Sequence, residues 1–165
     1  MNTWDEDRSV FNGHFELDIL IDSPVEKVWS QYMDTGSWVT SHDIEFIHGS
    51  PGTLGAVKRV AFKRARELGM PPPHYHFCKI IKLVPNQQHA LKTYTESAGA
   101  YGMRIIAFDD TRFHVIGTTT KVTFNIFMET RSEAAPKDPS AANMEASRAG
   151  MLVNLNNLKR IVEGR

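Results

Sequence analysis

The chain has 165 residues, which is enough for one domain with a substantial hydrophobic core. Its 19 basic and 19 acidic residues cancel, so no net charge attracts nucleic acid or an anionic membrane. No apolar run approaches the roughly 18 residues of a membrane span, and we expect no membrane insertion. The single cysteine, Cys78, excludes an internal disulfide and favours a cytoplasmic location, as does an acidic start without an apolar signal segment.

The first predicted elements are one strand and two short helices. Apolar and polar side chains alternate over residues 14–21, which predicts a strand with one buried face. A helix then begins at Ser23, the predicted N-cap, with Pro24 in the first helical position and Glu26 completing a capping box. Residues 37–40 form a second short helical turn.

Six more stretches have the alternation or the residue content of strands, and short turns separate most of them. Such turns imply antiparallel pairing. One stretch is rich in lysine and arginine, beginning at Lys58 and Arg59, and we interpret it as a solvated edge strand rather than a nucleic-acid site. The six strands are expected at 43–48, 54–64, 75–84, 89–97, 104–116 and 118–129.

The last segment, 138–164, has the pattern of one long amphipathic helix. Asp138 and Pro139 suit its N-cap and first residue, and Gly164 suits its end. At 1.5 Å per residue the helix would be roughly 37 Å long, so its apolar stripe needs a large partner surface, which the strands supply as a sheet. The stripe consists of Met144, Met151, Leu152, Leu155, Leu158, Ile161 and Val162.

Four stretches and the helix after them resemble the START/Bet v 1-like (SRPBCC) superfamily, in particular its polyketide cyclase/dehydratase-like branch. The stretches are FELDILIDSPVEKVWSQYMDTGSW, GSPGTLGAVKRV, IIKLVPNQQHALKTY and TTTKVTFNIFMET. The resemblance extends over residues 13–165, which we take as a single domain after an N-terminal extension at 1–12. It implies an α+β helix-grip fold, in which a seven-stranded antiparallel sheet wraps around the long C-terminal helix and two short helices lie between the first two strands.

The resemblance also implies a ligand. Members of this superfamily bind lipids, sterols, plant hormones or polyketides between sheet and helix, and some are cyclases, dehydratases, lyases or synthases. The geometry agrees, because a curved sheet around one helix leaves space that side chains do not fill. We therefore expect a hydrophobic or aromatic small molecule in that cavity and no cofactor.

Two histidines are the first candidates for chemistry. His74 and His76 are two residues apart, so on a strand they share one face. Two imidazoles can begin a metal site, but no third ligand stands at a recognisable spacing, and we expect no metal. A role as general acid or base is favoured, because the unperturbed histidine pKa of about 6.5 suits proton transfer near neutrality.

A second candidate set is Tyr94, Glu96 and Arg104. If these side chains point inward, they place a phenol, a carboxylate and a guanidinium in an apolar cavity, where they would stabilise an anion and move a proton. If they point outward, Glu96 and Arg104 form an exposed pair of little energetic value. The alternation does not decide which face is inside. The predicted ligand-contacting residues are Trp38, Tyr101, Phe108, His114, Phe124, Met151, Asn154 and Leu155.

Three functions fit these features. The first is a cofactor-free cyclase, dehydratase or lyase acting on an aromatic or polyketide-like molecule. The second is a non-catalytic carrier or sensor of a hydrophobic ligand, and the third is a protein-binding adaptor. A polar cavity favours chemistry, an apolar cavity favours carriage, and a closed core with an exposed apolar patch favours the adaptor. A homodimer is compatible with the sequence.

Overall fold

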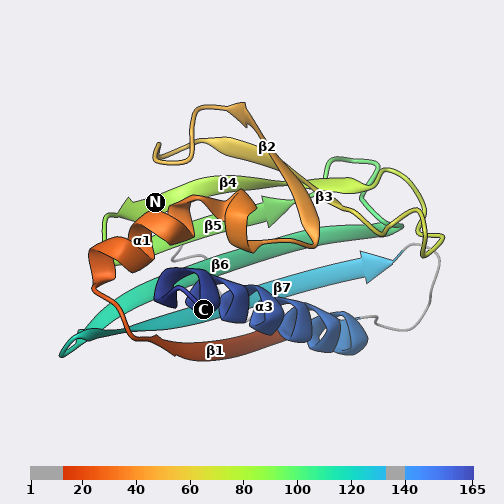
Figure 1. The fold of residues 1–165 in the computed structure, drawn as a ribbon. Coiled ribbons are helices and arrows are strands. Elements are labelled where there is room, and N and C mark those ends of the chain that lie inside the picture. The colour runs from red at the N-terminus through yellow and green to blue at the C-terminus, as the bar shows by residue number, and fades with distance from the viewer. Residues whose placement is uncertain (1–12, 133–139) are drawn as a thin grey trace.

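The computed structural model describes residues 13–132 and 140–165, and within them one sheet and three helices. The predicted extension at 1–12 and the predicted helix start at Asp138 and Pro139 lie outside the described residues. The elements, shown in Figure 1, are β1 Gly13–Ile21, α1 Val25–Met33, α2 Thr35–Trp38, β2 His42–His48, β3 Val57–Phe62, β4 Tyr75–Val84, β5 Gln88–Tyr94, β6 Met103–Ile116, β7 Thr119–Ser132 and α3 Ser140–Glu163.

All seven strands form one antiparallel sheet in the order β1-β7-β6-β5-β4-β3-β2. The sequence-adjacent strands β2 to β7 form a meander, and β1 joins it by pairing with β7. Figure 1 shows α3 lying against the same face of the sheet as α1 and α2. The predicted helix-grip architecture, with two short helices between the first two strands, is therefore confirmed.

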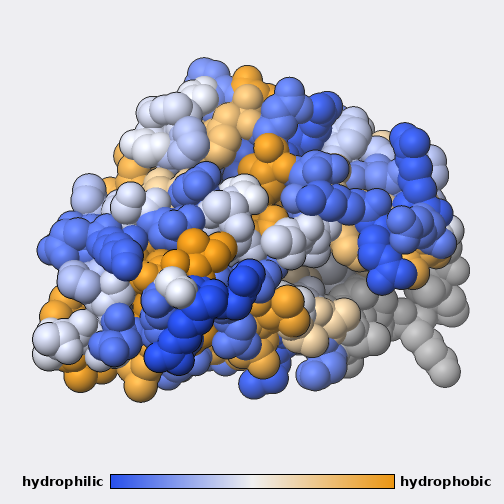
Figure 2. Space-filling model, in the orientation of Figure 1, coloured by the Kyte–Doolittle hydropathy of each residue, from blue (hydrophilic) through white to orange (hydrophobic). Residues whose placement is uncertain are grey.

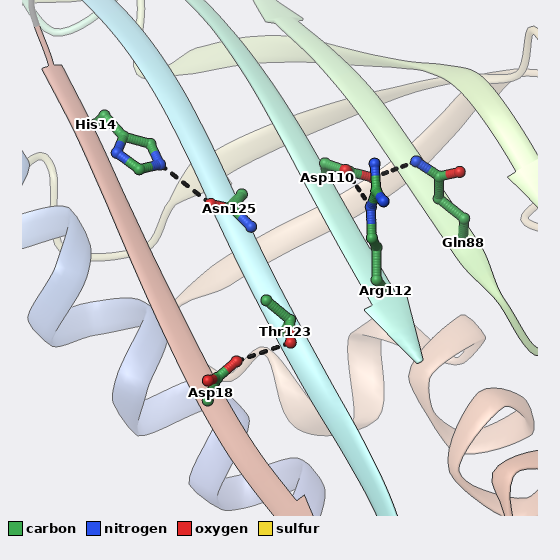
Figure 3. Close-up of polar contacts among 7 residues, drawn as sticks. All are labelled: His14, Asp18, Gln88, Asp110, Arg112, Thr123 and Asn125. Atoms are coloured by element: carbon green, nitrogen blue, oxygen red, sulfur yellow. Dashed lines mark hydrogen bonds and ion pairs between the residues drawn. The ribbon is translucent and has the colours of Figure 1, made fainter. Parts of the chain in front are cut away.

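The sheet has an apolar inner face and a polar outer face. In β1 every second residue is buried, from Phe15 to Ile21, which confirms the predicted alternation. Figure 3 shows polar side chains on the outer face, away from the helices. There Asp110 accepts hydrogen bonds from Gln88 at 2.6 Å and from Arg112 at 2.9 Å.

The long helix α3 is bound to the sheet through one apolar stripe. Leu155 and Leu158 are fully buried and Val162 nearly so, in a core cluster with side chains of β1 and β7. Leu152 is a correction to the predicted stripe, because its exposed fraction is 39%, and Asn154 is buried in its place. The helix ends at Glu163, and Gly164 adopts a positive φ of 70°, as expected for a helix terminator.

Three local predictions are wrong. Helix α1 has Pro24 rather than Ser23 as its N-cap and no side-chain cap, because the Pro24 carbonyl accepts the first helical hydrogen bonds. The Ser23 carbonyl instead accepts a hydrogen bond from the Thr120 hydroxyl at 2.8 Å. The second helical turn lies at Thr35–Trp38, two residues earlier than predicted. Strand β3 is an interior strand between β2 and β4, and not the predicted edge.

The packing of α3 can be tested with two truncations on the same helix. Leu158→Ala removes a fully buried side chain, and we expect it to lower the free energy of unfolding by about 3 kcal/mol. Val153→Ala alters a side chain that is 58% exposed, and should change the free energy of unfolding by less than about 0.5 kcal/mol. Urea unfolding followed by circular dichroism measures both. Equal effects would contradict the stripe as described.

Candidate functional site

A cavity of about 260 Å³ lies between the inner face of the sheet and the three helices. Every strand of the sheet and each of α1, α2 and α3 contributes at least one side chain to its wall. The space exists because α3 packs mainly on β1 and then β7, at one edge of the sheet. The side chains of β3, β4 and β5 therefore face a gap rather than the helix.

Six of the predicted site residues line this cavity. Trp38 is buried, and its indole N–H donates to the Tyr32 carbonyl at 2.9 Å, which fixes the ring in the wall. Asn154 is the buried amide of α3. The six are Trp38, His76, Tyr101, Phe124, Met151 and Asn154.

The other four predicted catalytic residues lie elsewhere. His74 precedes β4, so it does not share a strand face with His76, and its Nε2 lies 2.7 Å from the Met70 carbonyl oxygen. Tyr94 stacks on Phe77 on the outer face of the sheet, with 5.7 Å between ring centroids. Glu96 and Arg104 are exposed beside the turn between β5 and β6. These four do not form the inward group that the sequence permits.

Three predicted ligand contacts are also displaced from the cavity. Phe108 is buried, but on the outer face, where the Lys92 ammonium lies 5.5 Å from its ring centroid. His114 is exposed on the same face. Leu155 is fully buried in the core under α3 and does not line the cavity. Strand parity explains the first two, because they alternate with the inward-facing Asp109 and Phe113.

His76 and Tyr101 form a polar pair in the cavity wall. The Tyr101 hydroxyl oxygen accepts the Phe62 backbone N–H at 3.2 Å and lies 3.5 Å from His76 Nδ1. Since the hydroxyl oxygen already accepts a hydrogen bond, its own hydrogen is available for His76 Nδ1. The arrangement favours the His76 tautomer that carries its proton on Nε2. Tyr101 has a positive φ of 55°, and its backbone N–H donates to the Pro73 carbonyl at 2.9 Å.

Burial determines the charge state of His76. It lowers the pKa of His76 to about 4, with smaller contributions from His42 and from the Lys58 ammonium. Burial also lowers the pKa of His42, whose ring centroid lies 6.3 Å from that of His76. His76 is therefore neutral at pH 7 and presents an N–H donor or a weak base rather than an imidazolium acid.

Lys58 lies in the cavity wall, whereas the sequence interpretation placed it in solvent. It is only 7% exposed and lines the cavity, because it shares the inner face of β3 with Val60. The available signal was the alternation of Ala56, Lys58 and Val60, in which the lysine occupies an apolar phase. The adjacent Arg59, and Lys63, Arg64 and Arg66 further along the chain, concealed that phase.

Asp109 is the second residue that sequence reasoning missed. It lines the cavity from β6, and burial raises its pKa to about 7, while the Lys58 charge acts in the opposite direction. Its Oδ1 is buried and has no hydrogen-bond partner among the described residues. A carboxyl group with this pKa exchanges a proton readily near neutrality.

A neighbouring polar group is structural rather than reactive. The Tyr32 hydroxyl donates to Thr111 at 3.0 Å and lies 3.0 Å from His89 Nδ1. Burial lowers the pKa of His89 to about 3, so this histidine stays neutral. The Cys78 Sγ lies 3.2 Å from the Thr93 hydroxyl oxygen. Burial raises the pKa of the Cys78 thiol to about 11, which makes this cysteine a poor nucleophile.

Neither a metal nor a membrane span is evident in the part of the chain that the structure describes. Across residues 13–132 and 140–165, no three histidine, cysteine, aspartate or glutamate side chains are grouped so that they could hold a metal ion. None of the described helices is long and apolar enough to cross a bilayer.

Comparison with known proteins identifies the fold. No family model and no curated protein sequence matches the chain. A solved structure of a Chromobacterium violaceum protein matches with a TM-score of 0.65 at 15% identity, over 91% of this chain and 96% of that one. Ara h 8.0201 matches with a TM-score of 0.62 at 14% identity, over 93% and 99%. Truncated norcoclaurine synthase from Thalictrum flavum matches with a TM-score of 0.65 at 12% identity, over 91% and 92%. This chain therefore has the START/Bet v 1-like fold that its sequence resembles.

The raised pKa of Asp109 predicts a specific pH dependence of stability. Its pKa rises from 3.8 to about 7 on folding, so the folded state binds the proton more tightly. The contribution of this group to stability is complete below about pH 4 and is lost as the pH rises through about 7. Asp109→Leu should therefore stabilise the protein relative to wild type more at pH 8 than at pH 4.5, by on the order of 2 kcal/mol.

The measurement is the melting temperature of both proteins across that pH range. The histidines with lowered pKa values act in the opposite direction, with stability lost as the pH falls below about 6.5. They are present in both proteins and cancel in the difference. A difference that does not change with pH would contradict the raised pKa.

Proposed function

We propose that the protein binds a hydrophobic or aromatic small molecule in this cavity and catalyses cofactor-free proton-transfer chemistry on it, of the cyclase, dehydratase or lyase type. The observation that carries the proposal is the combination of a mostly apolar wall with a few inward polar groups. Asp109, His76 and Tyr101 all face the same cavity. A site that binds a ligand without changing it does not require a carboxyl group whose pKa is about 7.

The three groups have complementary roles in this proposal. Asp109 accepts and returns the proton, because its pKa lies near the working pH. His76 donates a hydrogen bond through Nε2–H to an oxygen of the substrate. Tyr101 positions His76 through the contact at Nδ1, and is itself held by the Phe62 backbone N–H. The predicted catalytic role of His76 is retained, with hydrogen bonding in place of acid catalysis.

A non-catalytic carrier is the second candidate, because much of the wall is aliphatic or aromatic. Phe15, Leu91, Ile126 and Met128 all face the cavity. An adaptor has less support. Figure 2 shows that apolar side chains reach the α1–α3 side of the surface in several separate places among hydrophilic ones. A homodimer and a cytoplasmic location stay predictions.

Ligand binding in the cavity can be tested by blocking it from α3. We expect phenols, polyketide mimics, sterols or fatty acids to raise the melting temperature of the wild type. A ligand at 100 times its Kd adds about 2.7 kcal/mol to the free energy of unfolding. Met151→Trp fills the cavity and should abolish the shift. Leu152→Trp adds the same ring to an adjacent, exposed position and should preserve it. Loss of the shift in both variants, or in neither, would contradict this site.

Catalysis is tested by following the bound compound with mass spectrometry. Asp109→Asn should lower turnover by roughly 10²- to 10⁴-fold, the usual contribution of a general base. Asp110→Asn is the matched control, since this neighbouring carboxylate lies on the outer face with Arg112 and Gln88 (Figure 3). A compound that binds tightly and remains unchanged in every protein would make this a carrier.

A further inference from the structure

The cavity wall contains a buried lysine ammonium that forms no ion pair with the described residues. Lys58 lies in β3 opposite Phe46 of β2 and Cys78 of β4, and is 7% exposed. Within the described residues, its ammonium forms no ion pair and no hydrogen bond. Burying a charge without a partner is costly, so an acceptor from outside the chain is expected to satisfy this group.

The Lys58 ammonium acts on groups from several strands. Burial is the largest influence on the pKa of each of five titratable side chains, and in each the Lys58 charge acts to lower that pKa. Because these side chains come from four different strands, the Lys58 ammonium lies in the space that the strands enclose. The five are His42 of β2, His76 and Cys78 of β4, His89 of β5 and Asp109 of β6.

Asp109 is the complementary group in the same cavity. Its strand neighbours are Leu91 and Ile126, which offer no hydrogen bond from their side chains. Its Oδ1 is buried and lacks a partner among the described residues, although the residue lines the cavity. A carboxyl oxygen in this situation requires a donor.

We propose that Lys58 and Asp109 hold the polar head of the ligand, and that this head is a hydroxyl group on an aromatic ring or an enol. The inference rests on the proposed function, since it names the substrate class of the same cavity. A hydroxyl group both accepts and donates. It therefore accepts from the Lys58 ammonium and donates to Asp109 Oδ1, and one small group satisfies both side chains.

Ionised head groups satisfy only one of the two. A carboxylate pairs with Lys58 but is repelled by Asp109 when that group is ionised, and an ammonium pairs with Asp109 but is repelled by Lys58. The walls select the remainder of the ligand. The rings of Phe15, Trp38 and Phe124 line the cavity and favour a flat aromatic body.

The test compares four probes with one ring system: 2-naphthol, 2-methoxynaphthalene, naphthalene and 2-naphthoate. The methyl ether keeps the acceptor and loses the donor, and naphthalene loses both. Calorimetry or ligand fluorescence gives the dissociation constants. We expect wild type to bind 2-naphthol roughly 10-fold or more tightly than the methyl ether, the range for a hydrogen bond to an ionised group.

Two substitutions remove the two partners separately. Asp109→Leu should reduce the preference for 2-naphthol over the methyl ether to within about 2-fold, because the hydroxyl donor loses its acceptor. Lys58→Met removes the ammonium and keeps a flexible, unbranched side chain, so it should weaken 2-naphthol binding while leaving naphthalene binding unchanged. Asp110→Asn, on the outer face of the sheet, should leave all four constants unchanged. Naphthalene binding also reports whether each variant retains a folded cavity.

The outcomes separate this inference from the proposed function. Equal binding of 2-naphthol and its methyl ether by wild type, tighter binding of 2-naphthoate, an unchanged preference for 2-naphthol over the ether in Asp109→Leu, or unchanged 2-naphthol binding in Lys58→Met would overturn the head-group assignment alone. Failure of all four probes to bind wild type would overturn the assignment and the ligand cavity together. A preference lost in Asp109→Leu and 2-naphthol binding weakened in Lys58→Met, with naphthalene binding retained in both, support the assignment.

Discussion

The position of α3 on the sheet is the constraint on which the other features depend. Leu155, Leu158 and Val162 bind the helix to β1 and β7, at one edge of a seven-stranded sheet. One helix is too narrow to cover seven strands spaced about 4.8 Å apart. The inner face of β3, β4 and β5 is therefore left to a cavity, and its chemistry follows from whichever side chains those strands direct inward.

Strands β3 and β6 direct polar groups into the space. An apolar lining would serve folding better, because an unpaired buried ammonium and an unpaired carboxyl oxygen both lower stability. Lys58 and Asp109 are such groups and line the cavity, whereas the buried Tyr32 and Thr111 hydroxyls bond to each other. The Thr130 hydroxyl is also buried without a partner among the described residues, but it does not line the cavity. Residues that reduce stability and face a cavity are characteristic of functional sites. Lack of a protein partner together with a position in the cavity wall distinguishes the candidate site from the structural network.

The sequence predicted the architecture because the fold has strong periodic signals. The alternation in β1 and the spacing of Leu155 and Leu158 are independent of the rest of the chain, and both are present in the structure. The site was harder, because it depends on which face of each inner strand points inward. In β6, Phe108 and Asp109 are adjacent, so their side chains point to opposite faces of the sheet. The apolar residue lies on the outer face and the acidic residue faces the cavity, against the usual expectation.

The most direct measurement of the central claim is a two-dimensional NMR spectrum of methionine methyl groups, recorded with and without 2-naphthol. Met128 and Met151 line the cavity, whereas Met33 and Met70 do not. A bound aromatic ring shifts the resonances of nearby methyl groups, so the account predicts that the Met128 and Met151 signals move and those of Met33 and Met70 stay. Shifts confined to Met33 or Met70, or no shift at any methionine at saturating 2-naphthol, would contradict a ligand site between the sheet and α3.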